Sequence, residues 1–316
     1  MTQEYRHIPV MLEECMEALQ LRDGSVYLDC TLGGAGHSLE AARRIAPSGI
    51  LLGIDQDDMA LETAGERLQG TGLDIAPILL KGNFGDMDRL LLQAQVPGVD
   101  AILFDLGVSS PQFDFPERGF SYREDAPLDM RMDPGNNTLT AAEIVNTYNE
   151  ADLARVLRDY SDEKWAARIA KFIAAQREEE PILTTFQLVD VIKRAIPAKA
   201  RREGGHPAKR SFQALRVEVN REMEVLQQAL EAAIRWLNPG GRIAVMSYQS
   251  LEDKMVKEAF RRAANPCTCP PELPVCMCGK KPVLRVITRK PVKASKAEVE
   301  ENPRAHSAVL RVAEKL

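Results

Sequence analysis

The sequence predicts an α/β fold, in which a Rossmann-like, doubly wound sheet of seven strands is interrupted by an inserted helical subdomain. Three observations support this prediction. Short aliphatic runs alternate with helical patterns over residues 1–112, the alternation stops over 113–206, and it resumes over 207–316. Strands that alternate with helices form parallel βαβ units, so the two outer stretches belong to one sheet.

Seven β-rich runs define the predicted sheet. Each is rich in β-branched or aliphatic residues and ends at polar residues or glycine. The runs are residues 26–30, 50–55, 75–81, 101–105, 242–248, 284–289 and 308–313. Seven strands with this alternation are typical of a Rossmann-like sheet.

Apolar residues spaced three and four apart predict the helices. In the outer stretches these are 38–45, 59–68, 87–95, a long helix 212–237 that ends at Asn238-Pro239-Gly240-Gly241, and 251–263. The middle stretch has helical patterns at 141–146, 150–160, 164–176 and 185–194, with no β-rich run between them. We therefore interpret residues 113–206 as a helical insertion between two parts of one domain, 1–112 and 207–316.

The composition indicates a globular protein with a sizeable core. Of the 316 residues 45% are hydrophobic and 28% are charged. No apolar run approaches the roughly 20 residues of a membrane helix, and the acidic N-terminus has no signal-peptide pattern, so we expect a cytoplasmic protein with no membrane partner. The net charge of -5 argues against nonspecific coating of nucleic acid but leaves room for a local basic patch.

A glycine-rich loop follows the first predicted strand, with the sequence Leu32-Gly33-Gly34-Ala35-Gly36-His37. Glycines at a strand-to-helix turn let the backbone approach a ligand closely, at the sheet edge where doubly wound folds bind nucleotides. The dinucleotide pattern G-x-G-x-x-G fails because Leu39 stands where the third glycine belongs. An NAD-dependent oxidoreductase is therefore disfavoured.

Side chains at the ends of the next three strands point to an adenosine ligand. Asp55 is placed to accept hydrogen bonds from ribose hydroxyls, although it could instead be a helix cap or turn residue. Phe84 could pack on the adenine or simply belong to the core. Asp105 ends the fourth strand at the same edge. His37 by itself reads equally well as a helix-start residue.

Several long sequence motifs resemble those of one known family. They occur in the family's order along essentially the whole chain, and their joint occurrence by chance is negligible. The motifs are HIPV at 7–10, DLGVSSPQ at 105–112, RGFS at 118–121, PLDMRMD at 127–133, FQALR at 212–216, SLED at 250–253 and NPRA at 302–305. The chain resembles the bacterial ribosomal RNA small subunit methyltransferase H family.

The resemblance implies S-adenosylmethionine-dependent methylation of the exocyclic N4 of one cytidine in the decoding region of 16S rRNA. It also implies a methyltransferase domain with a helical insertion, to which we assign substrate recognition. The expected partner is 16S rRNA in an assembling small ribosomal subunit, and the oligomeric state stays open. The cofactor contacts that the family implies fall on Ala35, Gly36, His37, Asp55, Phe84, Asp105 and Gln112.

Two departures from the family pattern bear on the site. Gln249 stands where the family commonly has histidine, in Ser247-Tyr248-Gln249-Ser250, and glutamine cannot take a proton at neutral pH. No general base is therefore assigned to that position. Ala35 stands where the family usually has glycine, which is tolerable if φ there is negative.

Asp105 and Ser109 are the predicted catalytic residues. The N4 amine of cytosine is a poor nucleophile because its lone pair is delocalised into the ring, so positioning and electrostatics must supply most of the rate. We expect Asp105 to accept a hydrogen bond from the amine, with Ser109 assisting. In the alternative reading Asp105 contacts only the cofactor. A noncatalytic module that binds SAM or a nucleotide and associates with RNA is the competing function.

Basic residues gather at the predicted junction between the insertion and the second part of the domain. Those expected to contact RNA phosphates are Lys199, Arg201, Arg202, Lys209 and Arg210. A charge run is as often only a solvated face.

Four cysteines crowd between positions 267 and 278. Cys267 and Cys269 form one C-x-C pair, and Cys276 and Cys278 form another. The four thiols are candidate ligands of a structural zinc ion, although each pair is one residue tighter than the usual C-x2-C knuckle. Free or redox-sensitive thiols are the alternative. Cys15 and Cys30 are expected to be buried as small hydrophobic residues.

Overall fold

The computed structural model describes residues 9–107, 115–202, 205–270 and 277–316. The chain divides into two compact units, Met1–Gly107 with Glu224–Leu316, and Val108–Met223. The second unit thus extends past the expected end of the insertion at residue 206. No helix in the described part of the chain is long and apolar enough to cross a membrane.

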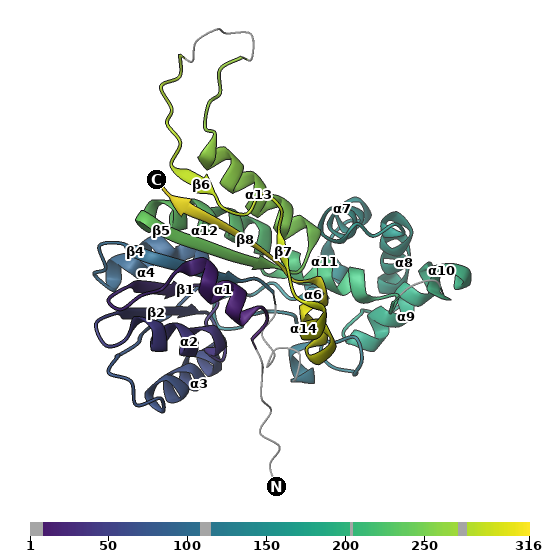
Figure 1. The fold of residues 1–316 in the computed structure, drawn as a ribbon. Coiled ribbons are helices and arrows are strands. Elements are labelled where there is room, and N and C mark those ends of the chain that lie inside the picture. The colour runs from purple at the N-terminus through teal and green to yellow at the C-terminus, as the bar shows by residue number, and fades with distance from the viewer. Residues whose placement is uncertain (1–8, 108–114, 203–204, 271–276) are drawn as a thin grey trace. The chain divides into compact units, whose positions relative to one another are not determined.

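The first unit contains a mixed sheet with the strand order β3-β2-β1-β4-β5-β8-β6 (Figure 1). Strands β1 to β5 are parallel to one another, and β8 is antiparallel to β5. The strands are β1 Val26–Asp29, β2 Ile50–Asp55, β3 Ile78–Lys81, β4 Val99–Asp105, β5 Leu237–Ser247, β6 Leu284–Val286, β7 Val292–Lys293 and β8 Val309–Lys315. The predicted Rossmann-like sheet is confirmed, and its count of seven misses only the two-residue β7, which pairs with β8.

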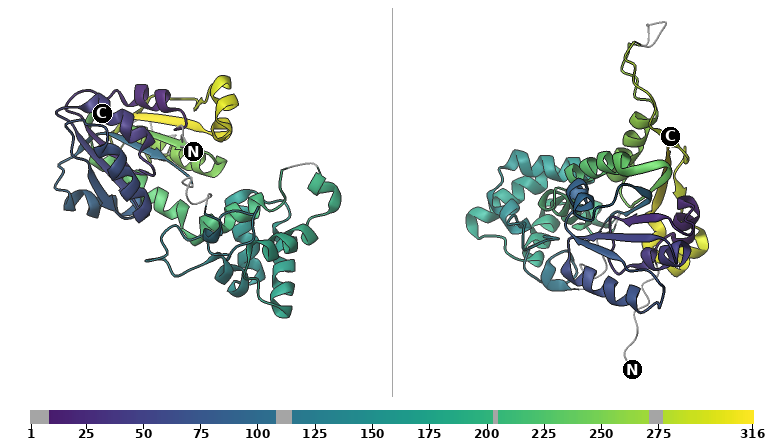
Figure 2. Two further views of the ribbon diagram at one scale, coloured as in Figure 1. Left: turned by 90° about the horizontal axis from the view of Figure 1, so that it is seen from below. Right: turned by 90° about the vertical axis from the view of Figure 1, so that its left-hand side faces the viewer.

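Alternation of buried side chains along the strands lets helices cover both faces of this sheet. Tyr27 and Leu51 pack into one core with α1 Leu12–Leu19, α2 Gly36–Ile45 and α3 Asp58–Gln69. Their neighbours Leu28 and Leu52 pack into the other with α4 Met87–Gln93, α12 Glu222–Trp236 and α13 Ser250–Ala264. Figure 2 shows the purple and blue N-terminal strands in one sheet with the green and yellow C-terminal ones. A short helix, α14 Lys296–Glu301, precedes β8.

The second unit is helical and has a core of its own. Its helices are α6 Ala141–Thr147, α7 Glu150–Ser161, α8 Ala166–Glu179, α9 Thr185–Ala195, α10 Ala198–Arg202 and α11 Lys209–Val219. Capping boxes begin two of them, Thr140 with Glu143 at α6 and Thr184 with Gln187 at α9. These boxes satisfy backbone N–H groups that a helix start leaves without partners.

The prediction of one long helix over residues 212–237 is wrong. Two helices, α11 and α12, stand there, separated at Asn220 and Arg221. Arg221 has a left-handed backbone with φ of 50°. The Asn220 side chain donates to the carbonyl of Met130 and accepts from the N–H of Met132, at 2.8 Å each. Helical periodicity continues through the break, so the pattern could not reveal it. The predicted end is off by one residue, since α12 ends at Trp236 and residues Asn238 to Gly241 already belong to β5.

Candidate cofactor and methyl-transfer site

Three parallel strands of the sheet each end in an aspartate. Asp29 ends β1, Asp55 ends β2 and Asp105 ends β4. The three strands are adjacent in the order β2-β1-β4, so their carboxyl ends meet at one edge of the sheet. In open α/β sheets ligands bind at this edge, which makes it the candidate site.

Asp29 is a buried structural carboxylate that the sequence reasoning did not single out. Its Oδ2 accepts hydrogen bonds from the Ser38 hydroxyl at 2.7 Å and the Tyr27 hydroxyl at 3.3 Å, and its Oδ1 accepts from the N–H of Thr31 at 3.1 Å. Only 2% of the residue is exposed. A buried carboxylate needs such donors, and here they tie β1 to the loop and to α2. The one sequence signal was its position at a strand end.

The glycine loop turns sharply between β1 and α2. Gly33 and Ala35 both have left-handed backbones, with φ of 48° and 59°. Alanine would replace glycine at little cost only if φ at position 35 were negative. Because φ is positive, Ala35 carries backbone strain on the order of 1 kcal/mol. At Gly36 a Cβ would come within 2.5 Å of Pro9 Cγ, so no side chain fits there.

Asp55 accepts a hydrogen bond from the glycine loop and can accept further hydrogen bonds from a ligand. Its Oδ2 accepts from the N–H of Gly33 at 2.8 Å and its Oδ1 accepts from the N–H of Asp57 at 2.9 Å. Each carboxylate oxygen can accept a second hydrogen bond. Burial raises the pKa of Asp55 to about 6, which the two N–H donors moderate. The turn contact to Asp57 and a hydroxyl-binding role are thus compatible.

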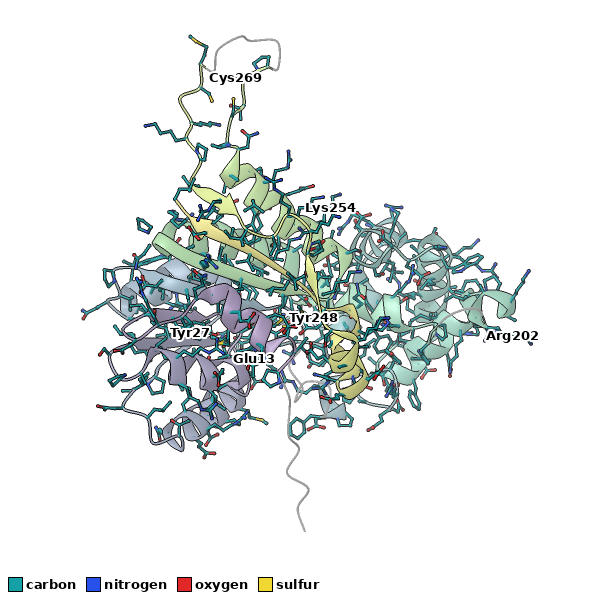
Figure 3. The ribbon with its side chains drawn as sticks, viewed as in Figure 1. Glu13, Tyr27, Arg202, Tyr248, Lys254 and Cys269 are labelled. Atoms are coloured by element: carbon teal, nitrogen blue, oxygen red, sulfur yellow. The ribbon has the colours of Figure 1, made fainter. Side chains whose placement is uncertain are left out.

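Asp105 is held from several sides yet stays partly open, with 28% of its side chain exposed. The Tyr248 hydroxyl donates to its Oδ1 at 2.7 Å, and its own N–H donates to the Thr31 hydroxyl at 2.7 Å. His37 Nδ1 lies 4.0 Å from its Oδ2. Burial raises the pKa of Asp105, while His37 and Tyr248 oppose the rise. Tyr248, labelled in Figure 3, was not among the predicted site residues.

The His37 side chain is buried, with 6% exposed. Its Nε2 donates to the carbonyl of Val10 at 3.0 Å, which fixes the ring with Nδ1 towards Asp105. The buried His37 ring therefore faces Asp105 from the start of α2. A ligand that contacts His37 would do so through the backbone of His37.

Phe84 begins the short 3-10 helix η1, Phe84–Asp86, directly after β3. Its half-buried ring packs edge-on against Phe104, with centroids 5.7 Å apart and an interplanar angle of 87°. The ring thus contributes to the core, and its partial exposure leaves area for an adenine.

Two predicted site residues, Ser109 and Gln112, lie outside the described residues. Gln249 precedes α13, where its N–H and that of Tyr248 both donate to Glu252 Oε2, at 3.1 and 2.9 Å. The position at which the family commonly has histidine thus belongs to a helix start.

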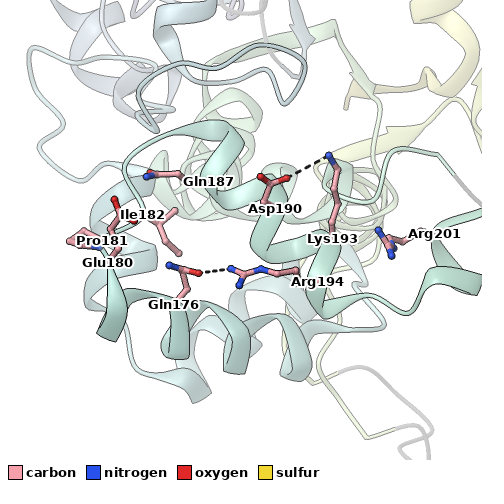
Figure 4. Close-up of a pocket in the computed structure, with 9 residues that line it drawn as sticks. All are labelled: Gln176, Glu180, Pro181, Ile182, Gln187, Asp190, Lys193, Arg194 and Arg201. Carbon is pink, nitrogen blue, oxygen red and sulfur yellow. Dashed lines mark hydrogen bonds and ion pairs between the residues drawn. The ribbon is translucent and has the colours of Figure 1, made fainter.

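The five basic residues predicted to contact RNA are exposed in the helical unit. Arg201 also lines a pocket of about 500 Å³ with Lys193 and Arg194 (Figure 4). Asp190 and Glu180 line it too, and Asp190 pairs with Lys193 at 3.8 Å. The pocket is therefore of mixed charge.

The cysteines fall into two classes. Cys15 and Cys30 are buried as predicted, and burial raises the pKa of both thiols. The sulfurs of Cys267, Cys269 and Cys278 lie within 4.8 Å of one another. Cys276 lies outside the described residues.

Comparison with known proteins identifies the family. The model of the MraW methylase family matches residues 4–316. The chain belongs to this family. It is 54% identical to the ribosomal RNA small subunit methyltransferase H of Symbiobacterium thermophilum, over 99% of this chain and 97% of that protein. The enzyme of the same name from Finegoldia magna is 53% identical over 99% of each chain. The family resemblance inferred from the sequence motifs is confirmed.

Among solved structures, a putative rRNA methylase from Clostridium thermocellum matches with a TM-score of 0.45 and 14% identity, over 98% of this chain and 99% of that chain. A putative methyltransferase from Streptococcus mutans in complex with SAH has a TM-score of 0.43 and 12% identity, over 98% and 99%. Both scores are below 0.5, so membership of this methylase family rests on the sequence match.

Substitutions in the loop should shift stability in opposite directions. Ala35→Gly should raise the free energy of unfolding by about 0.5–1 kcal/mol, because it relieves a left-handed alanine. Gly36→Ala should lower it by about 1–3 kcal/mol, because the new methyl group meets Pro9. Urea unfolding measures both. Gly205→Ala, where a Cβ meets nothing within 4 Å, is the control. A less stable Ala35→Gly would contradict the positive φ.

Proposed function

We propose that this chain transfers a methyl group from S-adenosylmethionine to the exocyclic N4 of a cytidine in the decoding region of 16S rRNA. The observation that carries the proposal is the partly open Asp105 carboxylate beside the glycine loop and Asp55. The family supports it, since full-length relatives at 51 to 54% identity carry the name ribosomal RNA small subunit methyltransferase H.

The residues present fit S-adenosylmethionine. The unused acceptor capacity of Asp55 suits ribose hydroxyls, and Phe84 offers ring area for the adenine. Ala35, Gly36 and His37 would contribute backbone contacts, and Gln112 remains a predicted contact. When bound, the cofactor supplies an electrophilic methyl group on a sulfonium ion.

Asp105 is the proposed catalytic residue. Its carboxylate would accept a hydrogen bond from the N4 amine, which orients the lone pair and disperses the developing positive charge. The Tyr248 hydroxyl fixes its Oδ1, His37 Nδ1 lies 4.0 Å from its Oδ2, and the raised pKa makes it a better proton acceptor than a solvated aspartate. Gln249 cannot share that role. Ser109 remains a predicted assistant.

RNA binding is assigned to the helical unit. Lys199, Arg201, Arg202, Lys209 and Arg210 are exposed there and would contact phosphates. The substrate is proposed to be 16S rRNA in an assembling small subunit, which places the reaction in the cytoplasm.

Removing the Asp105 charge should slow methylation strongly without loss of cofactor binding. We expect Asp105→Asn to lower turnover on 16S rRNA by about 100-fold or more, and Tyr248→Phe by about tenfold, with the Kd for S-adenosylmethionine nearly unchanged. Tyr148→Phe is the matched control, since it removes a tyrosine to carboxylate hydrogen bond in the helical unit. Mass spectrometry of digested RNA measures N4-methylcytidine, and calorimetry measures the Kd.

Full turnover by Asp105→Asn would contradict the catalytic role, and Asp105 would then be at most a cofactor contact. Cofactor binding with no methylation of any RNA by the unaltered protein would instead favour the noncatalytic module.

Charge reversal in the helical unit should weaken RNA binding alone. Arg201→Glu with Arg202→Glu should lower RNA affinity and reduce the slope of log K against log salt by about 1–2, because phosphate contacts release counterions. Filter binding at several salt concentrations measures this. Arg168→Glu with Lys171→Glu makes the same charge change on α8 and should leave the slope nearly unchanged. An unaltered slope in the Arg201 and Arg202 variant would contradict the assignment.

A further inference from the structure

We propose that Cys267, Cys269 and Cys278 bind a zinc ion that fixes the long loop between α13 and β6. This site is separate from the cofactor residues, and the proposal does not depend on the proposed methyl transfer. It is carried by the geometry of the thiols and by the polar groups that surround them.

The distances between the sulfurs are those of a metal site. All three lie within 4.8 Å of one another, and Cys267 Sγ lies 3.9 Å from Cys278 Sγ. Sulfurs bound to zinc at about 2.3 Å in a tetrahedron are about 3.8 Å apart. A disulfide needs about 2.05 Å between its two sulfurs, so at 3.9 Å Cys267 and Cys278 do not form one with each other. The arrangement therefore suits a shared ion better than a covalent pair.

The tight C-x-C spacing does not prevent this arrangement. In extended backbone the side chains of residues i and i+2 point to the same side. Cys269 precedes Pro270, which favours extended backbone at the cysteine. Cys267 and Cys269 can thus face one ion together, and the structure brings both near Cys278.

Polar groups around the thiols suit a charged thiolate cluster. The N–H of Met277 donates to Cys269 Sγ at 3.3 Å, the kind of contact that stabilises a metal-bound thiolate. Lys280 Nζ lies 3.3 Å from the Thr268 hydroxyl, which brings an ammonium group to the cysteine segment. Three thiolates and Zn²⁺ carry a net charge of about -1, which this lysine would partly offset.

The described parts of the loop, residues 265–270 and 277–283, contain no helix or strand, and Figures 1 and 2 show them extending away from the sheet. Cys269 is labelled in this extension in Figure 3. The N–H of Val283 donates to the carbonyl of Ala263 at 2.9 Å, at the base of the loop, and Met277 further out is 78% exposed. Long loops without a core of their own are uncommon, and a metal is one established way of ordering such a segment.

A tetrahedral ion needs a fourth donor beyond these three thiols. A water molecule or another side chain can supply it, and the three thiolates alone fix the position of the ion.

Metal analysis of the intact chain tests the proposal. The protein is purified under reducing conditions without chelator, and zinc is measured by mass spectrometry. We expect about one zinc per chain in the unaltered protein and in the control Thr268→Ala, and less than about a tenth of that in Cys267→Ser and in Cys278→Ser. Cobalt substitution should give thiolate-to-metal charge-transfer absorption in the first two proteins alone. Calorimetry with S-adenosylmethionine should give the same Kd in all four.

Zinc retained by both serine variants would overturn the proposal. So would reduced, unaltered protein that takes up no zinc from an equimolar solution, or a Cys267 to Cys278 disulfide in protein that is otherwise metal-free. Unchanged cofactor binding in the serine variants shows that they fold, so loss of zinc cannot be blamed on unfolding.

Discussion

The carboxylate of Asp29 is buried at the end of β1, and the geometry of the site depends on how its hydrogen bonds are satisfied. Ser38 bonds it from α2 and the N–H of Thr31 bonds it from the loop. The Thr31 hydroxyl then accepts the N–H of Asp105 from β4. Through the next residues of the loop, the N–H of Gly33 reaches Asp55 at the end of β2. One short segment therefore fixes the ends of three strands relative to each other.

The three aspartates have different environments and so suit different roles. Asp29 is enclosed by protein donors and serves the fold. Asp55 is held by two backbone N–H groups and retains acceptor capacity, as a ribose site requires. Asp105 is fixed by a tyrosine hydroxyl yet partly exposed, as contact with a reacting amine requires. The helical unit lies outside this arrangement and supplies the basic surface proposed for RNA.

Sequence patterns predicted what depends on local periodicity and on strand order. The strand ends, the glycine loop and the covered sheet follow from alternating aliphatic runs, because such runs leave few other folds. Tyr248 was missed because its partner, Asp105, is 143 residues away in sequence. Ala35 was misjudged because the sign of φ depends on the surrounding loop. The break at Asn220 was hidden because its side chain bonds a distant segment, at Met130 and Met132, while the apolar spacing continues.

The central claim is that the Asp55 carboxylate at the end of β2 holds the methyl donor, and the pH dependence of its binding tests this most directly. Burial gives Asp55 a pKa of about 6, and the ribose hydroxyls should prefer its ionised form. The affinity for S-adenosylmethionine should therefore fall below pH 6, by at most about tenfold per pH unit, as protonation removes acceptor capacity. In Asp55→Asn the affinity should be weak and independent of pH between 5 and 7, by calorimetry. An affinity that stays constant down to pH 5 in the unaltered protein, or is unchanged in Asp55→Asn, would contradict the claim.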